Sequence, residues 1–435
     1  MLSAFGSALK TPDLRKKILF TVMIIIIYRI GATLPSPGVS YANVNVCTQQ
    51  AGTNGVFNLI NLFSGGALLK LSLFALGIMP YITASIIIQL LVVVIPRFEQ
   101  LKKEGQSGQA KLTQYTRYLT VGLAVLQSTG VVALATRGQL FQNCNKPVIP
   151  DGSVFNLLVV VVVMTAGTGV VMWLGELITE RGVGNGMSIL ITINIMARLV
   201  PEGQSILKSG GGLIFFLICV FGILIIGSVV FVEQGQRRIP VQYAKRVVGR
   251  RMYGGTSTYL PLKVNQAGVI PVIFASSLLY LPQLISQLFA SGAGGGFQQW
   301  IQTHLVNQSD WVHILVYFLL IIFFTYFYIS ITFNVDERAD EMKKFGGFIP
   351  GIRPGRPTAE YLGHVLSRIT LPGSLYLGII AILPTFFLSL TGGGGNGQSF
   401  PFGGTSILII VGVGLDTVKQ IESQLMQRNY EGFLR

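Results

Sequence analysis

GIMPYITASI, at residues 77–86, returns later in the chain as GVIPVIFASS, at residues 268–277. At an offset of 191, five of the ten positions are identical, and both copies share one spacing of glycine and proline. A match of this kind within one chain indicates an internal repeat. The meaning of the repeat depends on where its two copies lie in the fold.

The composition is typical of a membrane protein. Of the 435 residues, 51% are hydrophobic and only 11% are charged, whereas a soluble domain carries about 25% charged residues. Ten apolar segments are long enough to cross about 30 Å of hydrocarbon as helices. They lie near residues 18–34, 74–95, 118–136, 154–174, 184–200, 212–232, 267–290, 312–333, 370–390 and 405–425.

Positive charge predicts the orientation of these segments. With a cytoplasmic N-terminus, 26 of the 32 Lys and Arg residues fall in inside regions, as cytoplasmic loops require. The two repeat copies then cross in opposite directions. The sequence therefore predicts two five-helix halves, residues 1–211 and 212–435, related by inverted pseudo-symmetry, with a transport pathway at their seam. The alternative is that the small residues of the repeat only allow two buried helices to pack closely.

Three loops have unusual compositions. Residues 57–69 are apolar but too short to span, which predicts either a re-entrant plugging segment or an amphipathic helix at the outer interface. Residues 233–266 carry seven basic residues and an alternation that predicts a cytoplasmic β-hairpin. Residues 334–369 contain the basic tip RPGR at 353–356. Both basic loops fit either ordinary positive-inside charge or the docking of an acidic partner.

Catalytic and metal-binding patterns are missing from the sequence. It contains no phosphate-binding GxxxxGK[ST] loop, and its three histidines follow no ligand or protease pattern, so we expect neither an enzyme nor a cofactor. Asp416 is the one acid well inside a predicted span, and a secondary transporter that uses Asp416 is the alternative function. Cys47 and Cys144 both fall in outside loops, which allows a disulfide bond between them.

Aliphatic residues recur at helical spacing beside the seam. Ile82 and Ile86 are four residues apart and share one helix face, as do Met187 and Ile191, and Ile273 is the repeat mate of Ile82. Such a stripe is by default core or lipid contact. An apolar collar would also suit a pathway that must pass varied cargo without binding it.

Over essentially its whole length the chain resembles the SecY family, the channel-forming subunits of the bacterial Sec protein translocase. The resemblance implies an all-α polytopic membrane protein, with about ten transmembrane helices in two inverted halves around a central pore and a short re-entrant plug helix. It also implies a protein-conducting channel that passes unfolded secretory polypeptides and releases hydrophobic segments sideways into lipid. The motifs that carry it include INLFSGGAL at 60–68, ALGIMPYITASIIIQLL at 75–91, MWLGELITERGVGNGMSI at 172–189, QRRIPVQYAKR at 236–246, LPLKVNQAGVIPVIFASS at 260–277 and FGGFIPGIRPGRPT at 345–358.

The resemblance also implies roles for individual residues. The pore ring would consist of Ile82, Ile86, Met187, Ile191, Ile273 and Ile409. The plug, at about 57–69, would include Asn58, Leu62, Phe63, Ser64, Gly65 and Gly66. A lateral gate would be held shut by polar residues such as Gln127, Ser276 and Ser277. A motor or ribosome would dock on Arg246, Arg250, Arg251 and Arg353.

The same resemblance implies the partners and the location. The partners would be the small membrane subunits SecE and SecG, the SecA ATPase, the ribosome, signal sequences, secretory precursors and membrane lipid. The location would be the bacterial inner (cytoplasmic) membrane, as a multi-pass protein with both termini in the cytoplasm. Because the sequence has no ATP site, we expect a conduit that is driven from outside.

Overall fold

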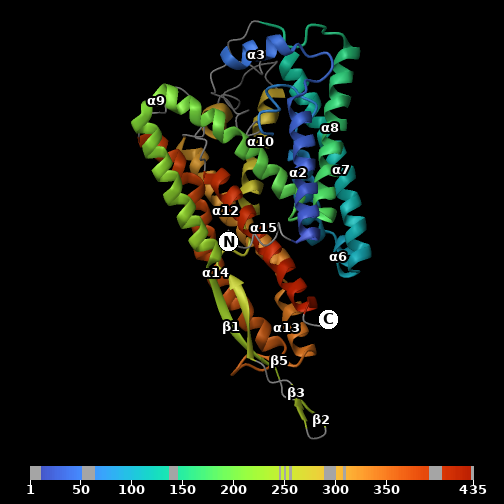
Figure 1. The fold of residues 1–435 in the computed structure, drawn as a ribbon, viewed down its shortest axis with the longest axis vertical. Helices are drawn as coiled ribbons and strands as arrows, with labels where there is room; N and C mark the ends of the chain where they lie inside the picture. Colours follow the sequence, from blue (N-terminus) through green and yellow to red (C-terminus); the bar gives the residue numbers. More distant parts are fainter. Residues whose placement is uncertain are drawn as a thin grey trace.

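A computed structural model describes residues 11–50, 64–136, 146–243, 246–248, 251–253, 257–288, 300–306, 310–390 and 404–432. These residues are mostly helical. Figure 1 shows the helices side by side in an elongated bundle, with a small group of strands projecting from one end and α3 at the opposite end. The predicted all-α membrane class is confirmed.

Each of the ten predicted spans falls on a helix of the structure. In the described part of the chain, five helices are long and apolar enough to cross a membrane, and a sixth is obtained if α5 and α6, which meet at 100°, form one broken span. The first part of the chain contains α2 (Pro12–Thr33), α3 (Tyr41–Gln50), α5 (Met79–Val94), α6 (Pro96–Lys103), α7 (Gln106–Thr136), α8 (Val154–Arg181) and α9 (Gly186–Gln234). The second part contains α10 (Ile270–Leu288), the π-helical turn η1 (Ile301–Val306), α12 (Trp311–Thr332), α13 (Val335–Lys344), α14 (Arg356–Leu390) and α15 (Gly404–Gly432).

Both copies of the internal repeat start a helix in the same way. Gly77 has a φ of 56° and Gly268 a φ of 63°, in the left-handed region that favours glycine. Two residues after each glycine a helix begins, α5 at Met79 and α10 at Ile270, again at an offset of 191. A proline follows in the first turn of each helix, where its missing N–H has no cost. The repeat in the sequence is therefore a repeat in local structure.

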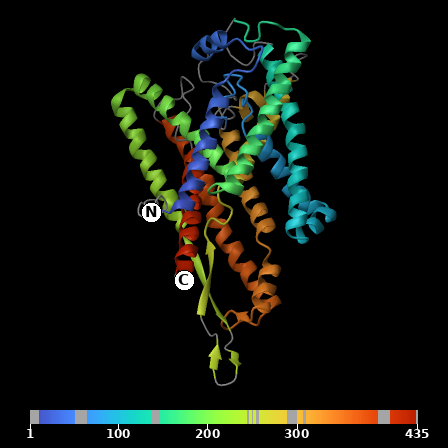
Figure 2. The same ribbon diagram turned by 45° about the vertical axis from the view of Figure 1, so that its right-hand side comes forward.

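Two predicted spans are joined in the single helix α9. Figures 1 and 2 show that its two arms run in different directions, and Pro201 lies inside the helix, where a proline removes a backbone hydrogen bond and favours a kink. The predicted boundary between the halves, at residue 211, thus lies within a helix and not in a loop. The division into two halves remains a prediction.

The two basic loops meet in one sheet. β1 (Gln236–Tyr243) pairs antiparallel with β4 (Ser257–Lys263), and β2 (Arg246–Val248) pairs antiparallel with β3 (Arg251–Tyr253). The predicted hairpin is confirmed. β5 (Gly347–Phe348), from the second basic loop, adds to the other edge of β1. These strands lie together at the end of the molecule in Figure 1.

The described part of the predicted plug is not helical. Residues 64–78 run through consecutive turns, because Gly65 and Gly66, with φ of 66° and 90°, are outside the right-handed helical region. The predicted helix is therefore wrong for residues 64–69, and residues 57–63 lie outside the described residues. Ala67, Leu68 and Leu71 are each at most 1% exposed. The segment inserts among the helices, which favours the re-entrant alternative over a helix at the outer interface.

Candidate functional site

Five of the six predicted ring residues pack into one apolar cluster, which we call the ring cluster. Ile191, Ile273 and Ile409 are each at most 7% exposed. Ile82 and Met187 pack against the same buried residues. The five side chains come from α5, α9, α10 and α15, so the cluster joins both predicted halves. None of these five side chains can form a conventional hydrogen bond, which is the chemistry of a dewetting constriction.

Ile86 lies in a neighbouring cluster. It is 8% exposed and packs with buried residues such as Ile225 of α9 and Ile321 of α12. Ile82, one turn earlier on α5, packs against both clusters. The place of Ile86 in the ring stays a prediction.

The start of α9 fixes the position of Met187. Asn185 caps the helix, since its Oδ1 accepts from the backbone N–H of Met187 at 3.1 Å and of Ser188 at 3.4 Å. Two glycines bring α8 and α9 together, because an added Cβ on Gly175 would meet the Met187 sulfur and one on Gly186 would meet the Gly175 carbonyl. The GVGNG stretch thus serves close helix packing.

The predicted gate residues lie on helices that meet across the two halves. α10 contacts both α5 and α7. Ser276 and Ser277 are buried on α10, and Ser276 Oγ donates to the Ile273 carbonyl at 2.9 Å. Gln127, on α7, is half-buried. Within the described residues no hydrogen bond joins Gln127 to either serine, so their role as a polar latch stays a prediction.

The predicted docking residues lie on the sheet and its neighbouring loop. Arg246 is in β2 and Arg251 in β3, whereas Arg250 lies outside the described residues. Arg353 is exposed, and its backbone is held by Thr358, whose Oγ1 donates to the Arg353 carbonyl at 2.9 Å. Arg353 is therefore an exposed basic side chain on a structured support.

The base of the hairpin carries a polar cluster that the sequence alone did not reveal. Glu233, at the end of α9, is 8% exposed and accepts a hydrogen bond from Asn265 Nδ2. The same amide donates to the Gly268 carbonyl at 3.1 Å, just before α10. Lys263 Nζ lies 3.3 Å from Asp416 Oδ1, and the Asp416 side chain is 65% exposed. In the sequence, the one indication of this cluster was that Glu233 is the only acidic residue in a loop with seven basic residues.

Cys47 lies close to the region of its predicted partner. Its Sγ is 4.0 Å from the Lys146 carbonyl oxygen, and Asn43, also on α3, donates to the Pro147 carbonyl at 2.8 Å. Cys47 takes part in a disulfide bond, and Cys219 is a free thiol. Cys144 lies outside the described residues, so the pairing itself stays a prediction.

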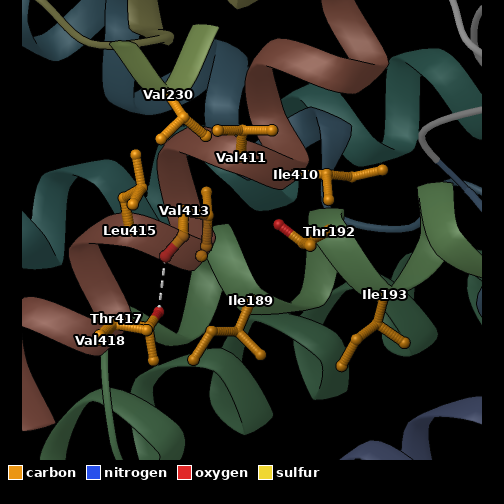
Figure 3. A pocket seen from close by; sticks show the side chains of 11 residues that line it. Ile189, Thr192, Ile193, Val230, Ile410, Val411, Val413, Leu415, Thr417 and Val418 are labelled. Atoms are coloured by element: carbon orange, nitrogen blue, oxygen red, sulfur yellow. Dashed lines mark hydrogen bonds between the residues drawn. The ribbon is translucent and has the colours of Figure 1, made fainter. Parts of the chain in front are cut away.

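An apolar groove of about 430 Å³ lies between α9 and α15. Figure 3 shows side chains from both arms of α9 and from α15 around it, including Ile189, Val230 and Ile410. Two hydroxyls among its lining residues are satisfied within their own helices, since Thr192 donates to Ser188 and Thr417 to Val413. The groove can therefore accept an apolar surface but offers little to a polar ligand.

Comparisons with known proteins give one consistent result. A family model described as SecY matches residues 72–418. The protein translocase subunit SecY of Mycobacterium tuberculosis (strain ATCC 25618 / H37Rv) is 68% identical, with 100% of both chains covered. The protein of the same name from Streptomyces coelicolor is 64% identical, again with 100% of both chains covered.

Solved structures share the fold at low sequence identity. A structure described as that of a protein conducting channel has a TM-score of 0.65 and 18% identity, with 94% of this chain and 91% of that chain covered. Sec61 in a canine ribosome–channel complex from the endoplasmic reticulum has a TM-score of 0.61 and 18% identity, with the same coverage. At this identity the likeness establishes the fold alone.

Proposed function

This chain belongs to the SecY family, and from that premise we propose that it is the channel through which unfolded secretory polypeptides cross the membrane. Its close relatives are named protein translocase subunits, so the chain is a channel and not an enzyme. The single observation that carries the proposal is the ring cluster, in which α5, α9, α10 and α15 each contribute an apolar side chain to one constriction.

An apolar constriction explains how varied cargo passes. Aliphatic side chains offer no hydrogen bonds or charges, so they hold no polypeptide sequence in preference to another. When the pore is idle, the same side chains close on each other and exclude water and ions. Residues 64–69, the described part of the predicted plug, include the buried Ala67 and Leu68 and act as part of the plug that must move aside when a polypeptide enters.

A lateral gate between α5 and α7 on one side and α10 and α12 on the other lets hydrophobic segments leave for lipid. An apolar signal helix gains about 25 cal/mol for each Å² of apolar surface that it removes from water. It binds the open gate better than the closed one, and it therefore shifts the channel towards the open state. Gln127, Ser276 and Ser277 hold the gate shut in its absence.

Reconstitution tests the function directly. Vesicles that contain the full chain with its small partner subunits, a motor ATPase and ATP should render a secretory precursor resistant to added protease. The matched control is the same precursor without its signal sequence, which should remain sensitive. A precursor that stays sensitive in vesicles with correctly inserted channel would contradict the proposal.

The alternative of a secondary transporter is not supported. A coupling acid should lie buried near the middle of the bilayer. Asp416 is instead largely exposed and pairs with Lys263 at the base of the hairpin. The family of this chain also consists of translocase subunits.

The sheet and the tip at Arg353 form the docking surface for the SecA motor or the ribosome. Exposed arginines lie on β1 and on the tip, and the pairing of β5 with β1 ties the two basic loops into one sheet. A related channel was solved in a ribosome complex, which supports this partner class. Positive charge on a structured surface favours an acidic partner and speeds its association.

The groove between α9 and α15 suits a transmembrane helix of a small partner subunit, and SecE is the candidate. The groove touches both arms of α9, so a helix there would brace the two halves. SecG is proposed as a second small subunit on family grounds. The uneven distribution of basic residues supports a location in the bacterial inner membrane with both termini in the cytoplasm.

A further inference from the structure

Two polar side chains lie against the first described residues of the plug, and a third is hydrogen-bonded to one of them. Tyr28 and Arg29 are on α2, and Asn194 is on α9. Asn194 Nδ2 donates to Tyr28 Oη at 2.6 Å, and both residues are 0% exposed. A Cβ added to Gly65 would lie 2.8 Å from both Arg29 Nη1 and Asn194 Oδ1. The plug backbone therefore packs directly against Arg29 and Asn194.

This contact lies one helical turn from the ring. Asn194 follows Ile191 by three residues on α9, so the two share a helix face. The Tyr28 ring stacks on Phe74, which lies near the end of the same segment, with 5.7 Å between ring centroids and 10° between planes. Gly31, the next turn of α2, leaves the space that Phe74 occupies. Tyr28 thus contacts the segment directly at Phe74, and its partner Asn194 contacts it at Gly65.

Such a contact is sensitive to small changes. A buried hydroxyl or amide loses free energy when its partner is removed, because no water replaces it. The left-handed φ of 66° at Gly65 also excludes most other residues. Arg29 Nη1 is buried with no hydrogen-bond partner in the described part of the chain. Withdrawal of the plug would let water reach it.

We propose that Tyr28, Arg29 and Asn194 form a polar seat for residues 64–66, and that the strength of this seat sets how readily the idle pore opens. The inference rests on the proposed function, because it assumes that the segment must leave for a polypeptide to pass. Weakening the seat raises the free energy of the closed state without changing any of the six predicted ring residues. The seat is then the threshold that a signal sequence has to overcome.

Tyr28→Phe tests the seat with the least disturbance, since it removes one hydroxyl and keeps the ring stack on Phe74. We expect about a fivefold rise in idle KCl conductance of the full channel complex in planar bilayers, the value of one net hydrogen bond. Asn194→Leu should act similarly, and the double variant should not exceed the larger single effect, because both changes remove the same bond. Gly65→Ala, which meets both Arg29 and Asn194, should also raise conductance.

Tyr376→Phe is the matched control. It removes another buried tyrosine hydroxyl, on α14, that has no hydrogen-bond partner among the described residues. Its idle conductance should equal that of the wild type. Seat variants should also translocate a precursor with a weakened signal sequence better than the wild type does.

Two failures can be told apart. If Tyr28→Phe and Gly65→Ala channels translocate a normal precursor at the wild-type rate and conduct no more KCl when idle, the seat is refuted and the channel function stands. If the wild-type channel itself fails to protect the precursor from protease, the proposed function fails whatever the seat variants do.

Discussion

Ile82 and Ile273 occupy equivalent positions in the two repeat copies, because each is the fourth residue of its helix, α5 or α10. Both side chains pack in the ring cluster. Branched aliphatic side chains are stiff and fill space closely. Met187 contributes an unbranched thioether, which is equally apolar but more pliable. At the residue scale, the seal therefore depends on apolar chemistry at each position more than on one shape.

A polar residue in the ring should make the idle pore leak. Ile82→Asn or Ile273→Asn places an amide that binds water inside the constriction, and we expect roughly a tenfold rise in idle ion conductance in planar bilayers. Ile225→Asn, on the second arm of α9 and equally buried in a neighbouring cluster, should leave conductance unchanged. Equal ion conductance in all three variants would indicate that any buried asparagine loosens the helix packing. The assignment of Ile82 and Ile273 to the pore ring would then be refuted.

The ring residues could be predicted from the sequence, whereas the seat could not. Ile82, Met187 and Ile191 follow from helical spacing and from resemblance, both of which are local patterns. Tyr28 and Asn194 are 166 residues apart and meet only because α2 and α9 are neighbours in the fold. A tyrosine near the end of an apolar span otherwise indicates nothing beyond an interfacial position.

At the scale of secondary structure elements, the glycine of each repeat copy sets the start of a helix. A Cβ on Gly268 would meet no atom within 4 Å, so only its φ of 63° opposes substitution. Gly122, inside α7, also has open space around it but a right-handed backbone. Comparing alanine substitutions at Gly268 and Gly122 therefore separates the cost of backbone strain from the cost of side-chain packing.

Gly268→Ala should destabilise the protein by about 1–2 kcal/mol, the cost of a left-handed conformation for alanine. Gly122→Ala should be neutral or slightly stabilising, because alanine favours helices. Thermal unfolding of the purified protein in detergent measures both. Equal unfolding temperatures for the two variants would mean that the turn before α10 adapts without strain.

The docking surface can be tested through its exposed tip. Arg353→Glu should weaken binding of the motor ATPase roughly tenfold, since it places a negative charge against an acidic partner. Membrane insertion should be normal, because the residue is exposed and outside the spans. Arg338→Glu, on α13 at the same end, is the control and should bind nearly as the wild type does. If the Arg353→Glu variant binds the motor ATPase with wild-type affinity, Arg353 is not part of the docking site.

The predicted disulfide bond between Cys47, on α3, and Cys144 can be tested chemically. Because Cys47 lies beside Lys146, we expect one Cys47–Cys144 disulfide and a free Cys219. Thiol titration of the unfolded, unreduced protein should then give one thiol out of three cysteines. Peptide mapping without reductant should yield one cross-linked pair that reduction separates. Three titratable thiols on the native, freshly isolated protein would refute the pairing.

Helices and strands could be predicted where they follow from a local sequence pattern. Apolar length placed each of the ten predicted spans on a helix, and alternation located the β1–β4 hairpin. The addition of β5 to that sheet depends on a pairing about a hundred residues away, which no local pattern encodes. The helix expected at 64–69 came from the family resemblance, whereas the left-handed φ of Gly65 and Gly66 produces turns there.

At the scale of the whole molecule, the two predicted halves meet in unequal ways. α9 runs from one half into the other as a continuous helix, whereas α10 touches α5 and α7 without any connecting chain. The second contact is therefore the one that can open without breaking the backbone. Composition, charge and the repeat predict the two halves and their opposite crossing directions, which stay predictions, and the width of the seam depends on side-chain packing.

Tying α7 to α10 should block lateral release while leaving the pore itself unobstructed. In a variant with Gln127→Cys and Ser276→Cys, a bifunctional thiol reagent can link the two cysteines. A short reagent should hold the gate shut, and a long reagent should leave it free to open. We expect the short link to abolish protease protection of a signal-bearing precursor, because the signal helix cannot enter lipid. Each single-cysteine variant treated with the same reagent is the control and should remain active. If the short-linked channel protects the precursor as well as the untreated one does, the signal helix leaves by another route and the α7–α10 seam is not the gate.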